Sequence, residues 1–378
     1  MAFSRRGFIR AMGASLATRA MTIPFSHAEG QSRPESTTSN SRVVRLNSNE
    51  NAYGPSSFVK AEVQKALVGV NRYPGSRDEL TRLIAEKHNV EIDRVVLGCG
   101  STEIIRAVAS HALRPEKSLI TASPTFEAMG EYSQGFGANV IQVPLTHELA
   151  HDLETMHGRI NATTAIIYIC NPNNPTASIT PRQTIQQFLG SVPTGVLVVI
   201  DEAYHHFAPL SATYQSFLDQ PVANQNLVVL RTFSRLYGLA GLRIGYAITS
   251  PDVAKRIRAQ TTRLGISEVG LRGAIASLQD EQRTRLAVKR NADDRQEFFN
   301  QAMARMLKPI DSKTNFVMMD VHHPAVEIIE HFRKNNVLIG RPFPPMNTYI
   351  RVSLGMPDEM HEFWRVWDML PFSHGMRM

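Results

Sequence analysis

The sequence is poor in cysteine and in aromatic residues. Its 378 residues include two cysteines, Cys99 and Cys170, and aromatic side chains make up 7% of the chain. Two cysteines are too few for a disulfide scaffold, and whether they pair stays open. No segment reaches the roughly 18 consecutive apolar residues of a membrane-spanning helix, so we expect no membrane span. The hydrophobic content of 43% is enough for one large core or two unequal domains of a globular protein.

Acidic residues are missing from residues 1–28, which contain Arg5, Arg6, Arg10 and Arg19. The formal net charge of the chain is +7, and the four arginines subtracted from it leave +3. A charge of that size is ordinary for a protein surface. We therefore expect no nucleic-acid partner.

The N-terminus has the features of an export signal in the right order. The run Ser4-Arg5-Arg6-Gly7-Phe8-Ile9-Arg10 resembles a twin-arginine signal, an apolar stretch follows, and Ser26-His27-Ala28 offers a small-residue cleavage site. We predict a signal peptide over residues 1–28 and a periplasmic protein that is exported in folded form by the twin-arginine machinery. A basic start that arose by chance is the alternative interpretation.

The rest of the chain shows a change of pattern near residue 255. Residues 31–41 are rich in Ser, Thr and Pro, which predicts a linker and N-terminal arm over residues 29–60. Short β-branched runs then alternate with helical patterns such as 102–113 and 182–189, which is typical of an α/β fold. The runs occupy residues 95–98, 119–122, 140–143, 165–170, 196–200, 227–230 and 244–248. We expect a mainly parallel seven-stranded sheet, flanked by helices, in a large domain over residues 61–255.

Beyond Pro251 the sequence has longer amphipathic patterns. They predict helices over residues 251–263, 267–280 and 281–306, two strands over 315–321 and 349–354, and a closing helix after Pro357. This order indicates a smaller α+β C-terminal domain over residues 256–378.

A glycine turn before the helical pattern at 102–113 is a candidate phosphate site. The run Gly98-Cys99-Gly100-Ser101-Thr102-Glu103 follows a predicted strand and opens a predicted helix. It therefore presents backbone N–H groups and a hydroxyl at the positive end of a helix dipole. Glu103 departs from the dinucleotide pattern G-x-G-x-x-G, and no Walker lysine is present. A simple turn is the alternative.

Polar residues follow two further predicted strands, in Asn171-Pro172-Asn173-Asn174-Pro175-Thr176 and in Asp201-Glu202-Ala203-Tyr204. The carboxyl ends of parallel strands face the binding crevice of such a sheet. An ionised aspartate there can hold a pyridine nitrogen in its protonated form, which makes the ring an electron sink. The separate alternatives are a helix cap for Asp201 and a turn for Asn174.

One segment carries a family resemblance. The run Thr232-Phe233-Ser234-Arg235-Leu236-Tyr237-Gly238-Leu239-Ala240-Gly241-Leu242-Arg243 resembles the cofactor-lysine segment of fold-type I pyridoxal-phosphate (PLP) aminotransferases, above all the histidinol-phosphate aminotransferase group, whose pattern is T-x-S-K-x-x-x-L-A-G-L-R. The resemblance extends from about Leu46 to Leu370. It implies the PLP transferase fold, an aminotransferase reaction on an amino substrate and a 2-oxo acid, and PLP or its amine form, pyridoxamine phosphate, as cofactor. We assign no metal site.

The resemblance also implies roles for individual residues. The cofactor set is Gly100, Ser101, Thr102, Thr232, Ser234 and Arg243 for the phosphate, Phe126 for the ring face, Asn174 and Tyr204 for the ring oxygen, and Asp201 for the ring nitrogen. Tyr73 is expected to reach the phosphate from a neighbouring subunit, which implies a homodimer with shared sites. Arg351 is expected to bind an anionic group of the substrate, and Asn51 and Tyr53 belong to the segment that closes over it.

Two positions depart from the family pattern. Ala177 replaces a glycine of N-P-x-N-P-T-G, and Arg235 stands where the family has the Schiff-base lysine. That lysine first binds the cofactor covalently and then moves a proton, and both tasks need a neutral amine. A guanidinium stays protonated at neutral pH and its nitrogens are poor nucleophiles. We therefore predict that the cofactor is held noncovalently.

Four interpretations of Arg235 stay open. The protein is an atypical aminotransferase that uses another base, such as Tyr237 or water; a PLP-binding pseudoenzyme; a lysine-independent dehydratase that uses pyridoxamine phosphate; or a chance variant of a lysine codon. The resemblance points to histidinol phosphate or an aromatic amino acid as substrate. The export signal argues against a role in histidine biosynthesis, which is cytoplasmic.

Overall fold

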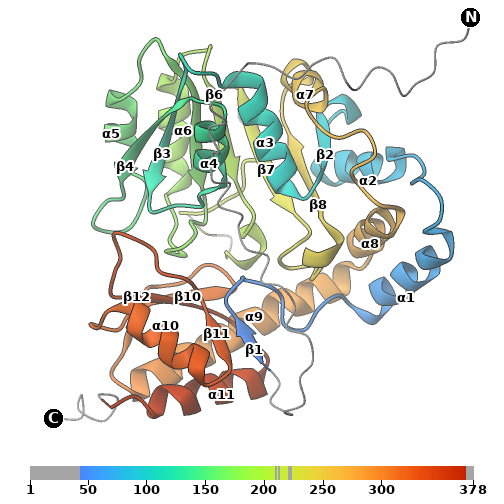
Figure 1. Cartoon of the computed structure of the whole chain (residues 1–378). Coiled ribbons are helices and arrows are strands. Elements are labelled where there is room, and N and C mark those ends of the chain that lie inside the picture. The colour runs from blue at the N-terminus through green and yellow to red at the C-terminus, as the bar shows by residue number, and fades with distance from the viewer. Residues whose placement is uncertain (1–42, 209–210, 212, 220–223, 372–378) are drawn as a thin grey trace, which may run out of the picture. The chain divides into compact units, whose positions relative to one another are not determined.

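The computed structural model describes residues 43–208, 211, 213–219 and 224–371. The predicted signal peptide and the first part of the linker lie outside these residues. The described residues belong to one compact unit (Figure 1). The division of this unit at residue 255 therefore stays a prediction.

The core element is a seven-stranded sheet in the order β2-β8-β7-β6-β5-β3-β4. Its neighbours pair in parallel, except that β8 runs antiparallel to both β2 and β7. The mainly parallel sheet expected from the sequence is thus confirmed. Its strands are β2 (Val95–Cys99), β3 (Ser118–Ser123), β4 (Asn139–Pro144), β5 (Thr164–Cys170), β6 (Leu197–Asp201), β7 (Leu227–Thr232) and β8 (Ile244–Ile248).

Helices cover both faces of this sheet, because side chains alternate along each strand and both sets are apolar. One face packs against α1 (Ser57–Ala66), α2 (Asp78–His88), α5 (Leu153–Gly158), α6 (Arg182–Ser191) and α8 (Glu268–Gln279). The other packs against α3 (Ser101–Ala112), α4 (Ala128–Gly135) and α7 (Pro251–Arg258). In β6 the residues Val198 and Ile200 face the first set of helices, whereas Leu197 and Val199 face the second.

The C-terminal part forms a second layer beside the carboxyl ends of the sheet strands (Figure 1). It contains β9 (Lys308–Pro309), β10 (Phe316–Asp320) and β12 (Tyr349–Ser353) in one antiparallel sheet, with α9 (Glu281–Ala304), α10 (Ala325–Lys334) and α11 (Pro357–Asp368). Their shared core is rich in aromatic residues, among them Phe332, Phe363 and Trp367. The helices and strands predicted beyond Pro251 are present, although α7 ends at Arg258 rather than near 263, and α7 and α8 pack against the large sheet.

The N-terminal segment joins this second layer. Strand β1 (Val44–Leu46) pairs in parallel with β11 (Val337–Ile339), and Leu46 is buried in the same core. Because of this pairing, the residues after Leu46 enter the space between the large sheet and the C-terminal layer.

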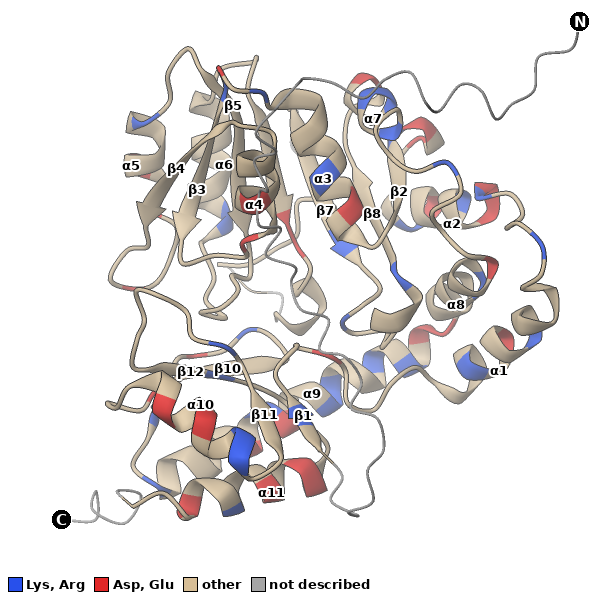
Figure 2. Ribbon diagram, viewed as in Figure 1, with Lys and Arg blue, Asp and Glu red and all other residues tan. Residues whose placement is uncertain are grey.

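Basic and acidic residues are interspersed along the helices (Figure 2), for example in α10, which carries Glu327, Glu330, Arg333 and Lys334. Among the described residues, none of the helices has the length and apolar character to cross a membrane.

Candidate active site

A pocket of about 200 Å³ lies where β5, β6 and β7 end and α3 begins. Ten of the residues selected from the sequence line it, namely Ser101, Thr102, Phe126, Asn174, Asp201, Tyr204, Thr232, Ser234, Arg235 and Arg243. Ser48, Glu50, Cys170, Ala203 and Ala240 complete the lining. The structure therefore gathers residues from six segments that are distant in the sequence.

The start of α3 forms a cradle at one end of the pocket. Gly100 precedes the helix with φ 74°, and a Cβ on it would overlap the Arg243 guanidinium. A Cβ on Gly245 would in turn overlap the Ser101 backbone nitrogen. These close approaches require glycine, and they place the guanidinium of Arg243 against the helix N-terminus. Arg243 also donates from Nη1 to the Ser234 hydroxyl at 3.4 Å. A helix N-terminus, a hydroxyl and an arginine together suit a phosphate.

Asp201 is the last residue of β6, lines the same pocket and is 2% exposed. Its carboxylate accepts hydrogen bonds from the Tyr168 hydroxyl at 2.8 Å and from the Ala203 backbone N–H at 3.0 Å. Burial raises the pKa of Asp201, although the hydrogen bonds of Tyr168 and Ala203 oppose the shift. A cationic ring nitrogen beside this carboxylate would supply the charge that the buried site lacks.

Tyr204, Asn174 and Arg351 lie on the side that faces the C-terminal layer. Arg351 donates from Nη1 to Asn174 Oδ1 at 2.6 Å and from Nη2 to the Asn47 carbonyl at 2.7 Å. Burial lowers the pKa of Arg351 to about 10, so it is still a cation at neutral pH. Arg351 contacts the pocket through Asn174 and does not line it.

Arg235 lines the pocket with its guanidinium 5.5 Å from the centre of the Tyr204 ring. Its Nη1 donates to two backbone carbonyls of the N-terminal segment, those of Ser48 and Asn49, both at 2.9 Å. Its Nε is buried without a hydrogen-bond partner. The side chain is thus held by the N-terminal segment rather than by another side chain of the pocket.

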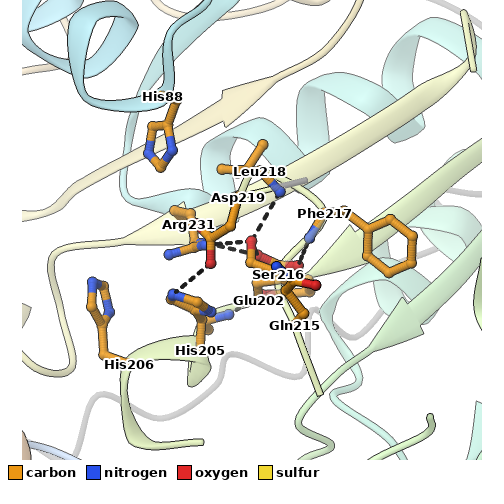
Figure 3. Close-up of polar contacts among 12 residues, drawn as sticks. His88, Glu202, His205, His206, Gln215, Ser216, Phe217, Leu218, Asp219 and Arg231 are labelled. Carbon is orange, nitrogen blue, oxygen red and sulfur yellow. Dashed lines mark hydrogen bonds and ion pairs between the residues drawn. The ribbon is translucent and has the colours of Figure 1, made fainter. Parts of the chain in front are cut away.

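A buried ion pair joins Arg231 and Glu202, which are adjacent in the sequence to the pocket residues Thr232 and Asp201 (Figure 3). Arg231 donates from Nε to Glu202 at 2.8 Å, and both side chains are at most 3% exposed. The Ser216 hydroxyl bridges the two, since it donates to Glu202 and accepts from Arg231, both at 2.6 Å. Burial by itself lowers the pKa of Arg231, but Glu202 raises it above its ordinary value.

Three histidines surround this pair, and we call His88, His205 and His206 the histidine cluster. Each bonds to a tyrosine hydroxyl, His88 to Tyr246 at 2.9 Å, His205 to Tyr214 at 3.2 Å and His206 to Tyr237 at 3.4 Å. Burial and the Arg231 cation lower the pKa of His88 to about 3 and also lower the pKa values of His205 and His206. Asp219, 3.9 Å from His205, is the nearby carboxylate besides Glu202, and Lys87 adds a further positive charge. All three rings are therefore neutral at pH 7.

Comparison with known proteins assigns the family. The model of the family "Aminotransferase class I and II" matches residues 41–363. This chain belongs to the class I and II aminotransferases. Histidinol-phosphate aminotransferases of Caldicellulosiruptor saccharolyticus and Carboxydothermus hydrogenoformans are each 36% identical to it over 326 residues, which cover 85% of this chain and 90% and 89% of the relatives.

Solved structures agree with this assignment. The crystal structure of histidinol-phosphate aminotransferase from Sinorhizobium meliloti, in complex with pyridoxal-5′-phosphate, has a TM-score of 0.81 and 25% sequence identity. The match covers 88% of this chain and 91% of that one. The fold is therefore that of the fold-type I PLP transferases, as the sequence predicted.

Some predicted site residues of this aminotransferase lie outside the pocket. Asn51 donates to the Leu236 carbonyl at 2.7 Å, and the Tyr53 hydroxyl lies 3.1 Å from Asp294 on α9. Both line a neighbouring pocket of about 190 Å³. Tyr73 is 83% exposed. These positions leave the roles of the three residues as predictions.

Tyr237, considered above as a replacement base, is also absent from the pocket lining. Its hydroxyl is directed to His206, and burial raises its pKa to about 12. A base with that pKa, bonded away from the pocket, is unsuited to removing a proton from a bound ligand.

The sequence reasoning missed several polar residues of the site. Asn49 is 1% exposed and donates to the Tyr204 hydroxyl at 2.9 Å, and Asn315 donates to the carbonyls of Asn49 and Glu50 at 3.0 and 3.1 Å. Asparagine also occurs in ordinary turns, so neither residue carried a signal of its own. Tyr168 sits within an apolar strand and gave no sign that it would bond to Asp201.

The second departure from the family pattern has a visible backbone consequence. Ala177 is fully buried and adopts φ 61°, in the left-handed region that favours glycine. Its N–H bonds to the Asn173 carbonyl at 2.9 Å, and its own carbonyl accepts from the Lys313 N–H at 2.9 Å. The loop therefore keeps the conformation that the family glycine allows, at a conformational cost.

Proposed function

We propose that this protein binds PLP, or pyridoxamine phosphate, noncovalently and acts as an atypical aminotransferase on an amino compound that carries an anionic group. The observation that carries the proposal is that the Asp201 carboxylate and the phosphate cradle at the start of α3 line one and the same pocket. A pyridine ring with a phosphate arm has the matching groups. The guanidinium of Arg243 lies directly against Gly100 at the start of this cradle.

Bound PLP supplies an electron-withdrawing ring that stabilises negative charge at the carbon next to the substrate nitrogen. The role of Asp201 is to keep the ring nitrogen protonated, and the Tyr168 hydroxyl orients that carboxylate. Asn174 and Tyr204 are the expected donors to the ring oxygen, and Phe126 covers the ring face. Arg243 and the start of α3 hold the phosphate.

Arg235 sets the limit of this proposal. No lysine is among the residues that line the pocket in the described part of the chain. Lys289 and Lys313 instead bond to Asp293 at 3.2 Å and Asp311 at 2.9 Å. An amino substrate then has to react with the bound cofactor directly. Loss of the lysine as both nucleophile and base lowers the rate by roughly 10²- to 10⁴-fold or more.

A noncovalent binding protein without turnover is the second candidate. The observation that favours it is the engagement of Arg235 Nη1 by the Ser48 and Asn49 carbonyls, which leaves this group unavailable to move a proton. Glu50 also lines the pocket, but its carboxylate accepts from Arg45 at 3.0 Å.

The assembly and location of the protein are further parts of the proposal. Exposure of Tyr73 at 83% supports a homodimer in which it contacts the partner's phosphate site. Val68 and Val70, which precede it, are 88% and 58% exposed and would be covered by the same contact. The twin-arginine run in residues 1–28 supports export in the folded state to the periplasm.

The test begins with the visible spectrum of the purified full-length protein and its reaction with borohydride. We expect a yellow protein that loses its colour on dialysis and forms no pyridoxyl-lysine adduct. An adduct on any native lysine would overturn the noncovalent mode. The Arg235→Lys variant should gain an adduct at residue 235, which would show that the rest of the pocket positions PLP correctly.

Turnover separates the two candidates. Amino donors that carry a carboxylate or a phosphate are tested with 2-oxo acids, in the native protein and in Arg235→Lys. Product formation by the native protein rules out the binding protein. Activity that appears in the lysine variant alone rules out the atypical enzyme. Arg351→Met should weaken the binding of the amino donor, because Arg351 is the residue expected to bind its anionic group.

A further inference from the structure

Ser48 and Glu50 of the segment Asn47–Glu50 line the pocket, and side chains bind each of the four backbone carbonyls of this segment. Arg351 binds the first carbonyl at 2.7 Å. Arg235 binds the second and third at 2.9 Å each. Asn315 binds the third and fourth at 3.0 and 3.1 Å. Three side chains from three distant parts of the chain thus hold four consecutive peptide groups.

The Asn49 side chain and backbone fix the middle of this segment. Its N–H donates to the Ser353 hydroxyl at 2.8 Å, that hydroxyl donates to Asn49 Oδ1 at 3.2 Å, and Asn49 Nδ2 donates to Tyr204 at 2.9 Å. Its φ of 54° lies in the left-handed region, where asparagine is better tolerated than most residues. In this conformation the segment satisfies all these donors and acceptors.

Arginine is suited to its place in this arrangement and lysine is not. One guanidinium nitrogen carries two N–H groups in a fixed plane, so Arg235 Nη1 can serve two adjacent carbonyls at once. A lysine amine that is engaged with a cofactor has no N–H left for these carbonyls. The residue that removes covalent attachment thus adds two charge-assisted hydrogen bonds to the wall of the pocket.

We propose that Arg235 is a positioning residue that clamps Asn47–Glu50 onto the pocket, so that a bound ligand is retained by enclosure instead of by a covalent bond. The clamp itself does not depend on what the pocket holds. Retention of PLP by the clamp rests on the proposed function.

Hydrogen exchange of the peptide 44–54, measured on the ligand-free full-length protein, tests the clamp. In Arg235→Met we expect exchange in this peptide to rise about tenfold, because opening of the segment no longer breaks charged hydrogen bonds. Arg235→Gln keeps one amide donor and should give a smaller rise. Arg333→Met, at an exposed position of α10, is the matched control and should leave the peptide unchanged. Exchange in β5 reports whether the sheet is intact.

The role of Arg235 would be overturned if peptide 44–54 exchanged within twofold of the native rate in Arg235→Met. Asn315→Ala, which removes the other side-chain donor to Asn49 and Glu50, should raise that rate and shows that the measurement can detect an opened segment. Should Arg235→Met not fold, Arg235→Gln and Arg235→Lys decide the question by the same comparison. A second measurement follows the release of PLP after dilution, by absorbance. We expect release about tenfold faster from Arg235→Met, and an equal rate would reject retention by enclosure. Failure of the native protein to bind PLP would reject the proposed function and leave the exchange result to decide the clamp.

Discussion

The histidine cluster predicts that the protein loses stability when the pH falls from about 7.5 to about 5. An unfolded histidine binds a proton near pH 6.5, whereas burial and Arg231 lower the pKa of His88 to about 3 in the folded chain. Below pH 6.5 the unfolded state therefore binds protons that the folded state does not. The free energy of unfolding therefore has its full value above about pH 6.5 and falls as the solution becomes more acidic.

The size of the effect follows from the two pKa values of His88. A folded pKa of about 3 against an unfolded value of 6.5 reduces the free energy of unfolding by about 2 kcal/mol at pH 5. Burial and Arg231 also lower the pKa values of His205 and His206, so both histidines add to the loss in the same direction. The loss at His88 alone is already a substantial share of the roughly 5–15 kcal/mol that stabilises a typical domain. Glu103 and Glu268, whose pKa values are lowered, titrate at still lower pH.

Urea unfolding followed by circular dichroism at a series of pH values measures this loss. His88→Gln keeps a hydrogen-bond partner for the Tyr246 hydroxyl and removes one titrating group, so its loss of stability should be smaller by about 2 kcal/mol. His361→Gln changes an exposed histidine of α11 and serves as the control. A native protein whose unfolding free energy stays within about 1 kcal/mol over this range, or a His88→Gln variant with the native pH dependence, would refute the reasoning.

Three other substitutions test the site and its support. Ala177→Gly should leave the free energy of unfolding unchanged or raise it by up to about 1 kcal/mol, because glycine adopts the left-handed conformation without strain. Ala109→Gly in α3 is the comparison and should lower the free energy of unfolding by about 1 kcal/mol or more, measured by urea titration. Arg231→Met should lower the free energy of unfolding by about 3–5 kcal/mol, because it leaves the Glu202 carboxylate buried without its partner. Calorimetry would contradict this if the single variant lost less stability than the double variant that also carries Glu202→Met. Asp201→Asn should weaken PLP binding by about ten- to a hundredfold in a spectroscopic titration, and an unchanged affinity would remove Asp201 from the ring-nitrogen site.

The large sheet could be predicted because its strands carry their signal locally. Each of the seven β-branched runs found in the sequence became a strand, since a run such as Thr164–Cys170 is buried on both faces of a parallel sheet. The pairing of β1 with β11 could not be predicted. Each strand has three residues, and the partners lie almost the whole chain apart. The reversed direction of β8 was likewise absent from the local pattern.

The residues of the site also fall into two groups, those whose positions the sequence predicts and those whose positions it does not. Asp201, Asn174 and Ser101 follow strands or open a helix, so their positions at one edge of the sheet follow from the topology alone. The contact between Asn315 and Asn49 depends on how the C-terminal layer packs against the N-terminal segment, and the local sequence does not predict that packing. The hydrogen bonds from Arg235 to the carbonyls of Ser48 and Asn49 could not be predicted for the same reason.

Asp201 and Glu202 are consecutive residues whose side chains lie on different sides of the sheet, one in the pocket and the other in the buried ion pair. In a mutational scan of this protein, substitutions at both positions would reduce activity, but for different reasons. Variants at 201 should accumulate as soluble protein with an altered ligand response, whereas variants at 202 should disappear from the soluble fraction. A measurement of protein abundance beside activity would separate chemistry from folding across a single peptide bond.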